Sequence, residues 1–93
     1  PNFAALIYGA PYGKLPAIPP KLPPVFMAWA QDDLTGLETV VRFHRALIMA
    51  GSEPEAHIFT AGGHGLGMRK QGTTSDHWID ELYYWLQAQH FIP

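Results

Sequence analysis

Three short runs of apolar residues predict the strands of this protein. Residues 3–8 and 25–30 are continuously apolar, which is typical of strands buried on both faces of a parallel sheet. Residues 55–60 alternate instead, with Ala56 and Ile58 on the opposite side from their neighbours. We therefore expect the third strand to be less buried than the first two.

Two further stretches have the spacing of amphipathic helices. In residues 37–50 the apolar side chains recur every three or four positions, and Gly51 is a typical helix stop. In residues 76–89 an aliphatic and aromatic stripe predicts a second helix, which Thr74 or Ser75 can cap. Such a stripe is typical of packing against a core rather than of cofactor stacking.

The order of these elements predicts an α/β fold. A strand, a connection, a second strand, a helix, a third strand, a loop and a helix favour a parallel sheet with right-handed crossovers. The connection, residues 9–24, contains six prolines, which exclude a helix or an interior strand there. We expect an extended segment that packs on the rest of the domain. A ligand for a proline-recognition domain is a less common alternative.

The composition removes several classes of function. The chain has 93 residues, of which 47% are hydrophobic, so it can form one small domain with a core. A formal net charge of −2 without a basic stripe argues against nucleic acid as a partner. The absence of cysteine excludes disulfide and thiolate chemistry. No apolar run approaches the ~20 residues of a membrane span.

A glycine-rich stretch with one histidine follows the third predicted strand. Residues 61–67 read Ala-Gly-Gly-His-Gly-Leu-Gly, with His64 at the centre. Glycine allows the backbone to bend sharply, and histidine is the side chain suited to moving protons near neutral pH. The motif by itself is equally consistent with a flexible turn and an incidental histidine.

Two adjacent acids follow the second predicted strand. Asp32 and Asp33 stand at its carboxyl end, where open α/β sheets keep ligand-binding and catalytic groups. An acid that caps the next helix is the alternative, and two acids allow both roles. Because one crossover helix separates the acids from His64, both should lie at the same sheet edge. An acid beside a histidine fixes its tautomer and stabilises the imidazolium.

With these pieces in place, the chain resembles the carboxyl-terminal part of an α/β-hydrolase, in the acetyl-esterase and dienelactone-hydrolase-like branch. The resemblance extends from about residue 3 to residue 86 and rests on the segments 23–33, 43–47, 50–51, 56–59, 62–67 and 85–86. It implies a hydrolase sheet represented here by three strands and two main helices. It also implies a serine carboxylic-ester hydrolase with an acyl-enzyme mechanism, in which Asp33 orients His64, the general base and then the general acid.

The chain departs from the family pattern in two places. The segment after the acids is shorter than usual, and the nucleophile elbow Gly-x-Ser-x-Gly is absent. Ser52 and Ser75 stand in contexts unlike an elbow. We therefore expect residues 1–93 to be the carboxyl-terminal part of a single hydrolase domain. The nucleophile and oxyanion hole would lie upstream, and the isolated chain would be inactive.

The resemblance also predicts partners. The substrate would be a small ester, such as an acetylated sugar or a short-chain acyl ester, and no cofactor is expected. Trp29, Leu66 and Met68 are near the site residues in the sequence and are candidates for a substrate pocket, although packing is the more common role for a residue such as Trp29. Strand 3–8 should pair on its open side with the missing amino-terminal segment or with another chain.

Three other interpretations compete with the hydrolase. A non-catalytic α/β fragment or subunit could bind a partner chain through its exposed sheet edge. A metal site built from His57, His64, His77 and the acids lacks the usual ligand spacing, so no metal is expected. A dinucleotide site fails because Gly67 comes one position too early for the fingerprint.

Overall fold

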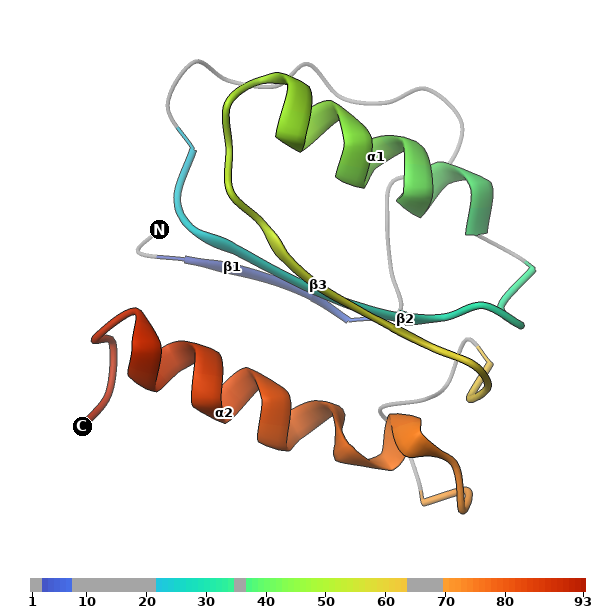
Figure 1. Cartoon of the computed structure of the whole chain (residues 1–93). Helices are drawn as coiled ribbons and strands as arrows, with labels where there is room; N and C mark the ends of the chain where they lie inside the picture. The colour runs from blue at the N-terminus through green and yellow to red at the C-terminus, as the bar shows by residue number, and fades with distance from the viewer. Residues whose placement is uncertain (1–2, 8–21, 35–36, 64–69) are drawn as a thin grey trace.

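Three parallel strands lie between two helices in the computed structural model of the chain (Figure 1). The structure describes residues 3–7, 22–34, 37–63 and 70–93. Its elements are the strands β1 (Ala4–Ile7), β2 (Val25–Ala30) and β3 (Glu55–Phe59), the helices α1 (Leu37–Met49) and α2 (Trp78–Ala88), and a 3₁₀ turn, η1 (Thr74–His77). The predicted α/β class and all three strands are confirmed.

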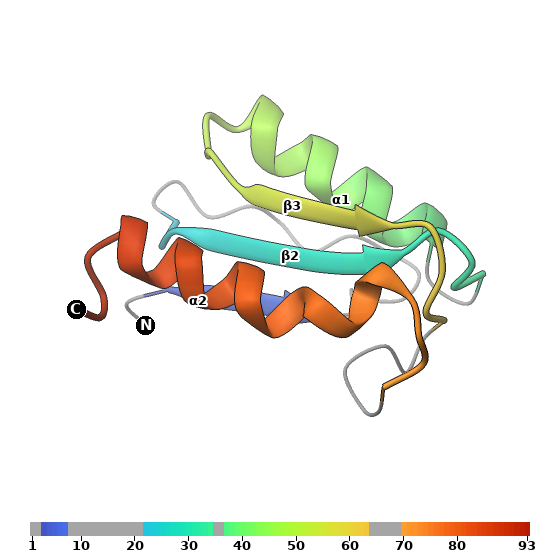
Figure 2. The same cartoon turned by 60° about the horizontal axis from the view of Figure 1, so that its bottom comes forward.

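The strands are arranged in sequence order, β1-β2-β3 (Figure 2). In the register of β1 with β2, Ala4 is opposite Val25. In that of β2 with β3, Phe26 is opposite Glu55. Both pairings are parallel, so the carboxyl ends of β2 and β3 lie at the same edge of the sheet.

Strand β2 is the centre of the core, because its side chains alternate between two apolar layers. On one face Val25, Met27 and Trp29 form a cluster with α1 residues. On the other face Phe26 and Ala28 form a cluster with Trp85 of α2. All six residues of β2 are buried. The two outer strands are less well covered, as expected when only one helix packs on each face.

Helix α1 ends where the sequence predicts. Gly51 has φ of 87°, a left-handed conformation that glycine adopts without a steric penalty. The Gly51 N–H donates to the Ile48 carbonyl and the Ser52 N–H donates to the Leu47 carbonyl, both at 3.0 Å. This pair of bonds is a Schellman motif, which satisfies carbonyls at the end of a helix.

The start of the last helix differs from the prediction. Helix α2 begins at Trp78 and is preceded by the η1 turn, whose cap position is Thr73. The expectation that Thr74 or Ser75 caps this helix is wrong, since both residues lie inside η1 and no side chain makes a cap hydrogen bond. The nearby carboxylate of Asp76 instead accepts hydrogen bonds from the preceding loop.

The predicted proline-rich connection is described only at its end. Residues 22–24 lead into β2, and Leu22 packs against the α1-side core. Residues 9–21 lie outside the described residues. No helix in the described part of the chain has the length and apolarity needed to cross a membrane.

Candidate functional site

The two acids lie in a tight turn that follows β2. The Asp33 N–H donates to the Ala30 carbonyl at 3.1 Å, and the Leu34 N–H donates to the Asp32 carbonyl at the same distance. This turn gives the two adjacent acids different surroundings. Asp32 is exposed, whereas Asp33 is buried, with 6% of its surface accessible. Electrostatic interactions of Asp33 are therefore less screened by water than those of Asp32.

The glycine turn leaves β3 at the same edge of the sheet. The ladder between β2 and β3 continues past β2, because the Gln31 N–H donates to the Phe59 carbonyl at 2.8 Å. Gly62 and Gly63 have φ of 145° and 65°. These are conformations that residues with a side chain rarely adopt. The two glycines thus bend the chain back toward the acids.

The carboxylate of Asp32 joins the two turns. Its Oδ1 accepts a hydrogen bond from the Gly63 N–H at 2.8 Å, and its Oδ2 accepts a longer one from the Gly62 N–H at 3.4 Å. The predicted closeness of the two strand ends is therefore confirmed for Asp32 and the glycines. His64 is the next residue and lies outside the described residues. The proposed contact between Asp33 and His64 stays a prediction.

A second set of hydrogen bonds is made where the chain becomes described again. The side-chain amide of Gln71 donates to the Gly62 carbonyl at 2.9 Å. The Asp76 carboxylate accepts bonds from the N–H groups of Gln71 at 2.8 Å and Gly72 at 2.9 Å. The hydrogen bond from Gln71 is the main reason that the pKa of Asp76 is below its ordinary value. The bond from Gly72 and the positive charge of Lys70 act in the same direction.

Sequence reasoning missed the roles of Gln71 and Asp76. Residues 68–74 match no helix or strand pattern, and Asp76 is by its position only an acid at the start of the predicted helix 76–89. No periodicity or motif marks a side chain that bonds to backbone groups of a neighbouring loop. The spacing of Asp76 from Gln71 and Gly72, four to five residues, is the only local signal.

Of the three predicted pocket residues, the structure describes Trp29. Its side chain is 2% exposed and belongs to the core between β2 and α1. Its ring centroid lies 6.0 Å from that of His44 on α1. The indole N–H has no hydrogen-bond partner within residues 3–7, 22–34, 37–63 and 70–93. Leu66 and Met68 lie outside the described residues, so the substrate pocket stays a prediction.

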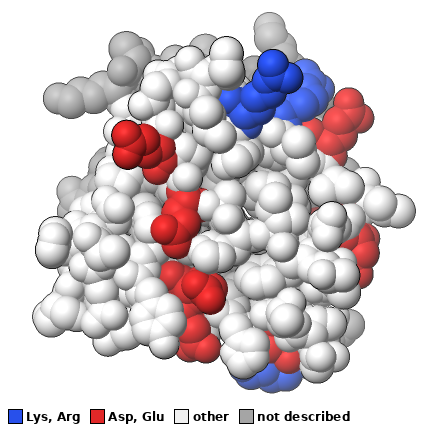
Figure 3. Space-filling model, in the orientation of Figure 1, with Lys and Arg blue, Asp and Glu red and all other residues white. Residues whose placement is uncertain are grey.

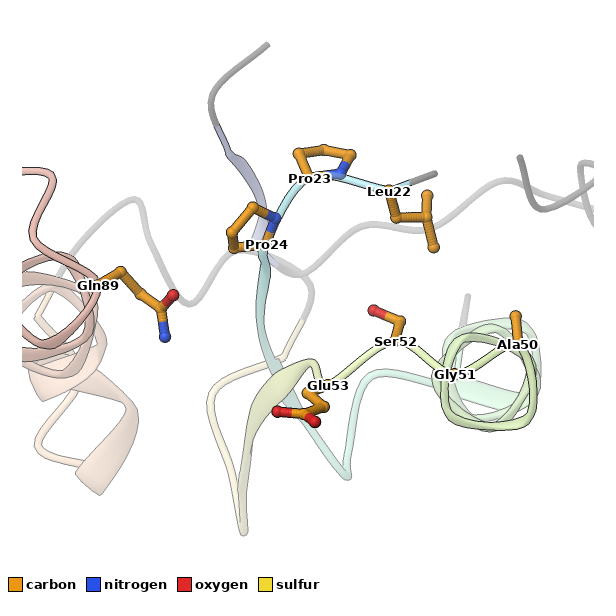
Figure 4. A pocket seen from close by; sticks show the side chains of 8 residues that line it. All are labelled: Leu22, Pro23, Pro24, Ala50, Gly51, Ser52, Glu53 and Gln89. Carbon is orange, nitrogen blue, oxygen red and sulfur yellow. The ribbon is translucent and has the colours of Figure 1, made fainter. Parts of the chain in front are cut away.

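A cavity of about 340 Å³ lies at the end of the sheet where strands β2 and β3 begin (Figure 4). It is bordered by the chain entering β2, the loop between α1 and β3, and the end of α2. Its lining residues are Leu22, Pro23, Pro24, Ala50, Gly51, Ser52, Glu53 and Gln89. The sequence did not predict this cavity. Because it lies where β2 and β3 begin, it is separate from the acids and glycines at their carboxyl ends.

The alternative metal site gains no support from the described histidines. His57 lies 2.9 Å from the Glu55 carboxylate and 3.9 Å from that of Glu81. His77 lies 3.5 Å from Asp80. Among the described residues, no group of three or more histidine, cysteine or acidic side chains could hold a metal ion. On the face shown in Figure 3, several acidic side chains follow one another left of the centre, and the basic side chains lie at the upper right and at the bottom.

No protein-family model, curated protein or solved structure matches this chain. The fold class therefore rests on the geometry alone. That geometry is a parallel three-stranded sheet with one helix on each face.

Proposed function

We propose that this chain belongs to a serine carboxylic-ester hydrolase of the α/β-hydrolase type, and that it supplies Asp33 and His64 to a Ser-Asp-His triad. The serine and the oxyanion hole would come from residues outside this sequence. The substrate would be a small ester, with an acetylated sugar or a short-chain acyl ester as the leading classes.

The observation that carries the proposal is the contact between Asp32 and the glycine turn. Its two hydrogen bonds, to the N–H groups of Gly62 and Gly63, bring the acid turn to the backbone that immediately precedes His64. The sheet order supports it as well, because a triad of this type needs acid and histidine on neighbouring strand ends.

The burial of the acids favours Asp33 as the partner of His64. A carboxylate that must stabilise an imidazolium does so more strongly in a water-poor environment. Asp33 is 6% exposed, and Asp32 is exposed with both oxygens bonded to backbone amides. This assigns different tasks to two chemically identical neighbours.

The roles in catalysis follow from these assignments. The serine oxygen attacks the ester carbonyl carbon, and its proton passes to His64. The resulting imidazolium, held by Asp33, gives the proton to the departing alcohol. A water molecule then attacks the acyl-enzyme and gives a proton to His64. His64 returns this proton to the serine oxygen as the bond to the acyl carbon breaks and the acid product leaves.

The test uses the complete product of the gene that encodes this chain, with p-nitrophenyl acetate and butyrate as substrates. We expect hydrolysis and covalent labelling by a fluorophosphonate. His64→Ala and Asp33→Asn should each lower kcat on the order of 10⁴-fold. Asp80→Asn, a matched change at an exposed acid on α2, should leave kcat unaltered. Full activity in His64→Ala would reject the proposal.

A different observation favours the second candidate function, partner binding through β1. Strand β1 contains no charged residue and, in the described part of the chain, is paired with β2 alone. Ala5 is exposed, and Ile79 and Tyr83 of α2 are about half exposed, at 50% and 49%. An uncharged edge strand beside exposed apolar side chains is the usual setting for an added strand.

The size of the isolated chain tests this second function. If β1 accepts another strand, the 93-residue chain should self-associate or bind the rest of the hydrolase. Sedimentation velocity measures the first, and co-expression with the upstream part of the gene product measures the second. A monomer that melts sharply and binds neither would exclude it.

A further inference from the structure

The backbone on both sides of residues 64–69 is held by acidic side chains. On one side the Asp32 carboxylate accepts from Gly62 and Gly63. On the other side the Asp76 carboxylate accepts from Gln71 and Gly72. Each carboxylate bonds to two consecutive N–H groups, which is an effective way to fix a peptide segment because the acceptor is charged.

The two sides are also joined to each other. The Gln71 side-chain amide donates to the Gly62 carbonyl at 2.9 Å, so the incoming and outgoing backbones are connected directly. Gly62 therefore has both its N–H and its carbonyl engaged, and it is buried. The position of this glycine is fixed by two elements, the β2 turn and the segment that precedes η1.

The two glycines need these hydrogen bonds to keep one backbone conformation. Gly62 and Gly63 adopt positive φ values of 145° and 65°, and glycine loses more conformational freedom on folding than any other residue. Without external bonds, a turn of two glycines would sample many backbone conformations. The hydrogen bonds to Asp32 restrict that sampling at the residue that immediately precedes His64.

We infer that Asp32 is a positioning residue of the proposed hydrolase, which fixes the backbone before His64 relative to Asp33. The inference rests on the proposed function. Asp32 and Asp33 share one peptide unit, so an aspartate bonded to the glycine turn also fixes the position of Asp33 relative to Gly63. The Gln71 side chain holds Gly62 as well, through its carbonyl.

The magnitude of the effect follows from the geometry of proton transfer. A displacement of about 1 Å in a catalytic group can cost on the order of 100-fold in rate. Asp32 does not touch substrate in this scheme, so its loss should act on kcat and leave KM nearly unchanged. Because Asp32 is exposed, its replacement leaves the apolar core intact.

The experiment compares Asp32→Ala and Asp32→Asn with the matched control Asp80→Ala in the complete gene product. Alanine removes both acceptor oxygens, whereas asparagine keeps one. Amide hydrogen exchange at Gly62 and Gly63 should accelerate about tenfold or more in Asp32→Ala and less in Asp32→Asn. The control, an exposed acid on α2, should leave exchange at both glycines unaltered.

Kinetics with p-nitrophenyl acetate give the second readout. We expect kcat to fall on the order of 100-fold in Asp32→Ala, with KM within about threefold of its original value and a smaller loss in Asp32→Asn. Unaltered exchange at the glycines would overturn the inference, and so would faster exchange with full kcat. A wild-type protein without esterase activity would instead reject the proposed function, and with it the catalytic part of this role.

Discussion

The two outer strands of the sheet, β1 and β3, differ in the side chains that protect their open edges against pairing with another strand. Strand β3 carries Glu55 and His57, which lie 2.9 Å apart, and His57 also approaches Glu81 of α2 at 3.9 Å. Strand β1 has the sequence Ala-Ala-Leu-Ile, without a polar side chain. Charged side chains on an edge strand discourage another strand from pairing. Strand β3 therefore resembles the end of a sheet, and β1 resembles an interior strand.

Helix α2, which covers one face of the sheet, differs in the same way between its β3 side and its opposite side. Glu81 of α2 reaches toward β3. Ile79 and Tyr83, which lie one turn apart, are on the other side of the buried stripe, toward β1, and about half of each is exposed. At the β1 end of the sheet, Phe3 contacts Trp85 and Phe91 through ring centroids 5.9 and 5.1 Å apart. The residue that leads into β1 thus packs against aromatic side chains of α2 and of the segment that follows it.

This contrast shows that, in one small sheet, the side chains of one edge strand can discourage strand pairing while those of the other edge strand do not. The charged side chains of β3 protect its edge, whereas β1 has no charged side chain that could do so. The difference supports the proposal that more polypeptide belongs beside β1. Substitutions in the central strand, at each edge and in the loop after β3 test how far the two sides of the sheet differ.

The largest effect on stability is expected in β2, the strand that lies between the two edge strands. Phe26→Ala removes a fully buried ring from β2 and should lower the free energy of unfolding by about 3–5 kcal/mol. That loss is comparable to the total stability of many small domains. Ile58→Ala on β3, where the side chain is 53% exposed, is the control and should change it by about 0.5 kcal/mol or less. Equal losses, measured by chemical denaturation, would mean that β2 is not the common core.

A charge placed on β1 should have the next largest effect. Ala5→Lys introduces an ammonium group at an exposed position of this edge, and we expect it to abolish association of the isolated chain. Ile58→Lys makes the same change on β3 and should leave association unaltered. Sedimentation velocity distinguishes the two. Loss of association in Ile58→Lys alone would reverse our assignment of the open edge.

The contact between Glu55 and His57 on β3 should contribute little to stability. Both side chains are partly exposed, so water and salt screen the attraction that exists when His57 is protonated. Glu55→Gln should lower the free energy of unfolding by about 1 kcal/mol or less, and the difference should shrink in high salt. Association in Glu55→Gln at a level absent from the unaltered chain would show that the charge has a protective role beyond stability.

The smallest effect concerns the loop that leaves β3. The pKa of Asp76 is lowered chiefly by the hydrogen bond from the Gln71 N–H. Because this pKa is lowered, the stabilisation of the loop by the ionised Asp76 carboxylate is fully present above about pH 3.9, the ordinary value. It is lost as the pH falls through the folded-state pKa. Amide exchange at Gln71 and Gly72, corrected for intrinsic rates, should accelerate in that acid range. Asp76→Asn should remove the pH step, and a step that persists would assign it to another group.

Much of the fold could be predicted from the sequence. Continuous apolar runs located β1 and β2, and Gly51 marked the end of α1. The lesser burial expected of β3 holds against β2 but hardly against β1, because no residue of β1 is buried either. The start of α2 could not be predicted as well, because Thr74 and Ser75 are good capping residues by chemistry and neither side chain caps it. Both residues lie inside the η1 turn, and the Asp76 carboxylate is the side chain that bonds the N–H groups of Gln71 and Gly72.

The candidate site shows the same division more sharply. The sequence by itself determined that acids and glycines follow neighbouring strands, since hydrophobic periodicity and turn residues act locally. Only the tertiary structure decided that the Asp32 carboxylate accepts hydrogen bonds from Gly62 and Gly63 while Asp33 is buried. Two adjacent aspartates are identical as residue types, and the turn after β2 points them into different surroundings. That choice depends on atoms about thirty residues away, which no local pattern contains.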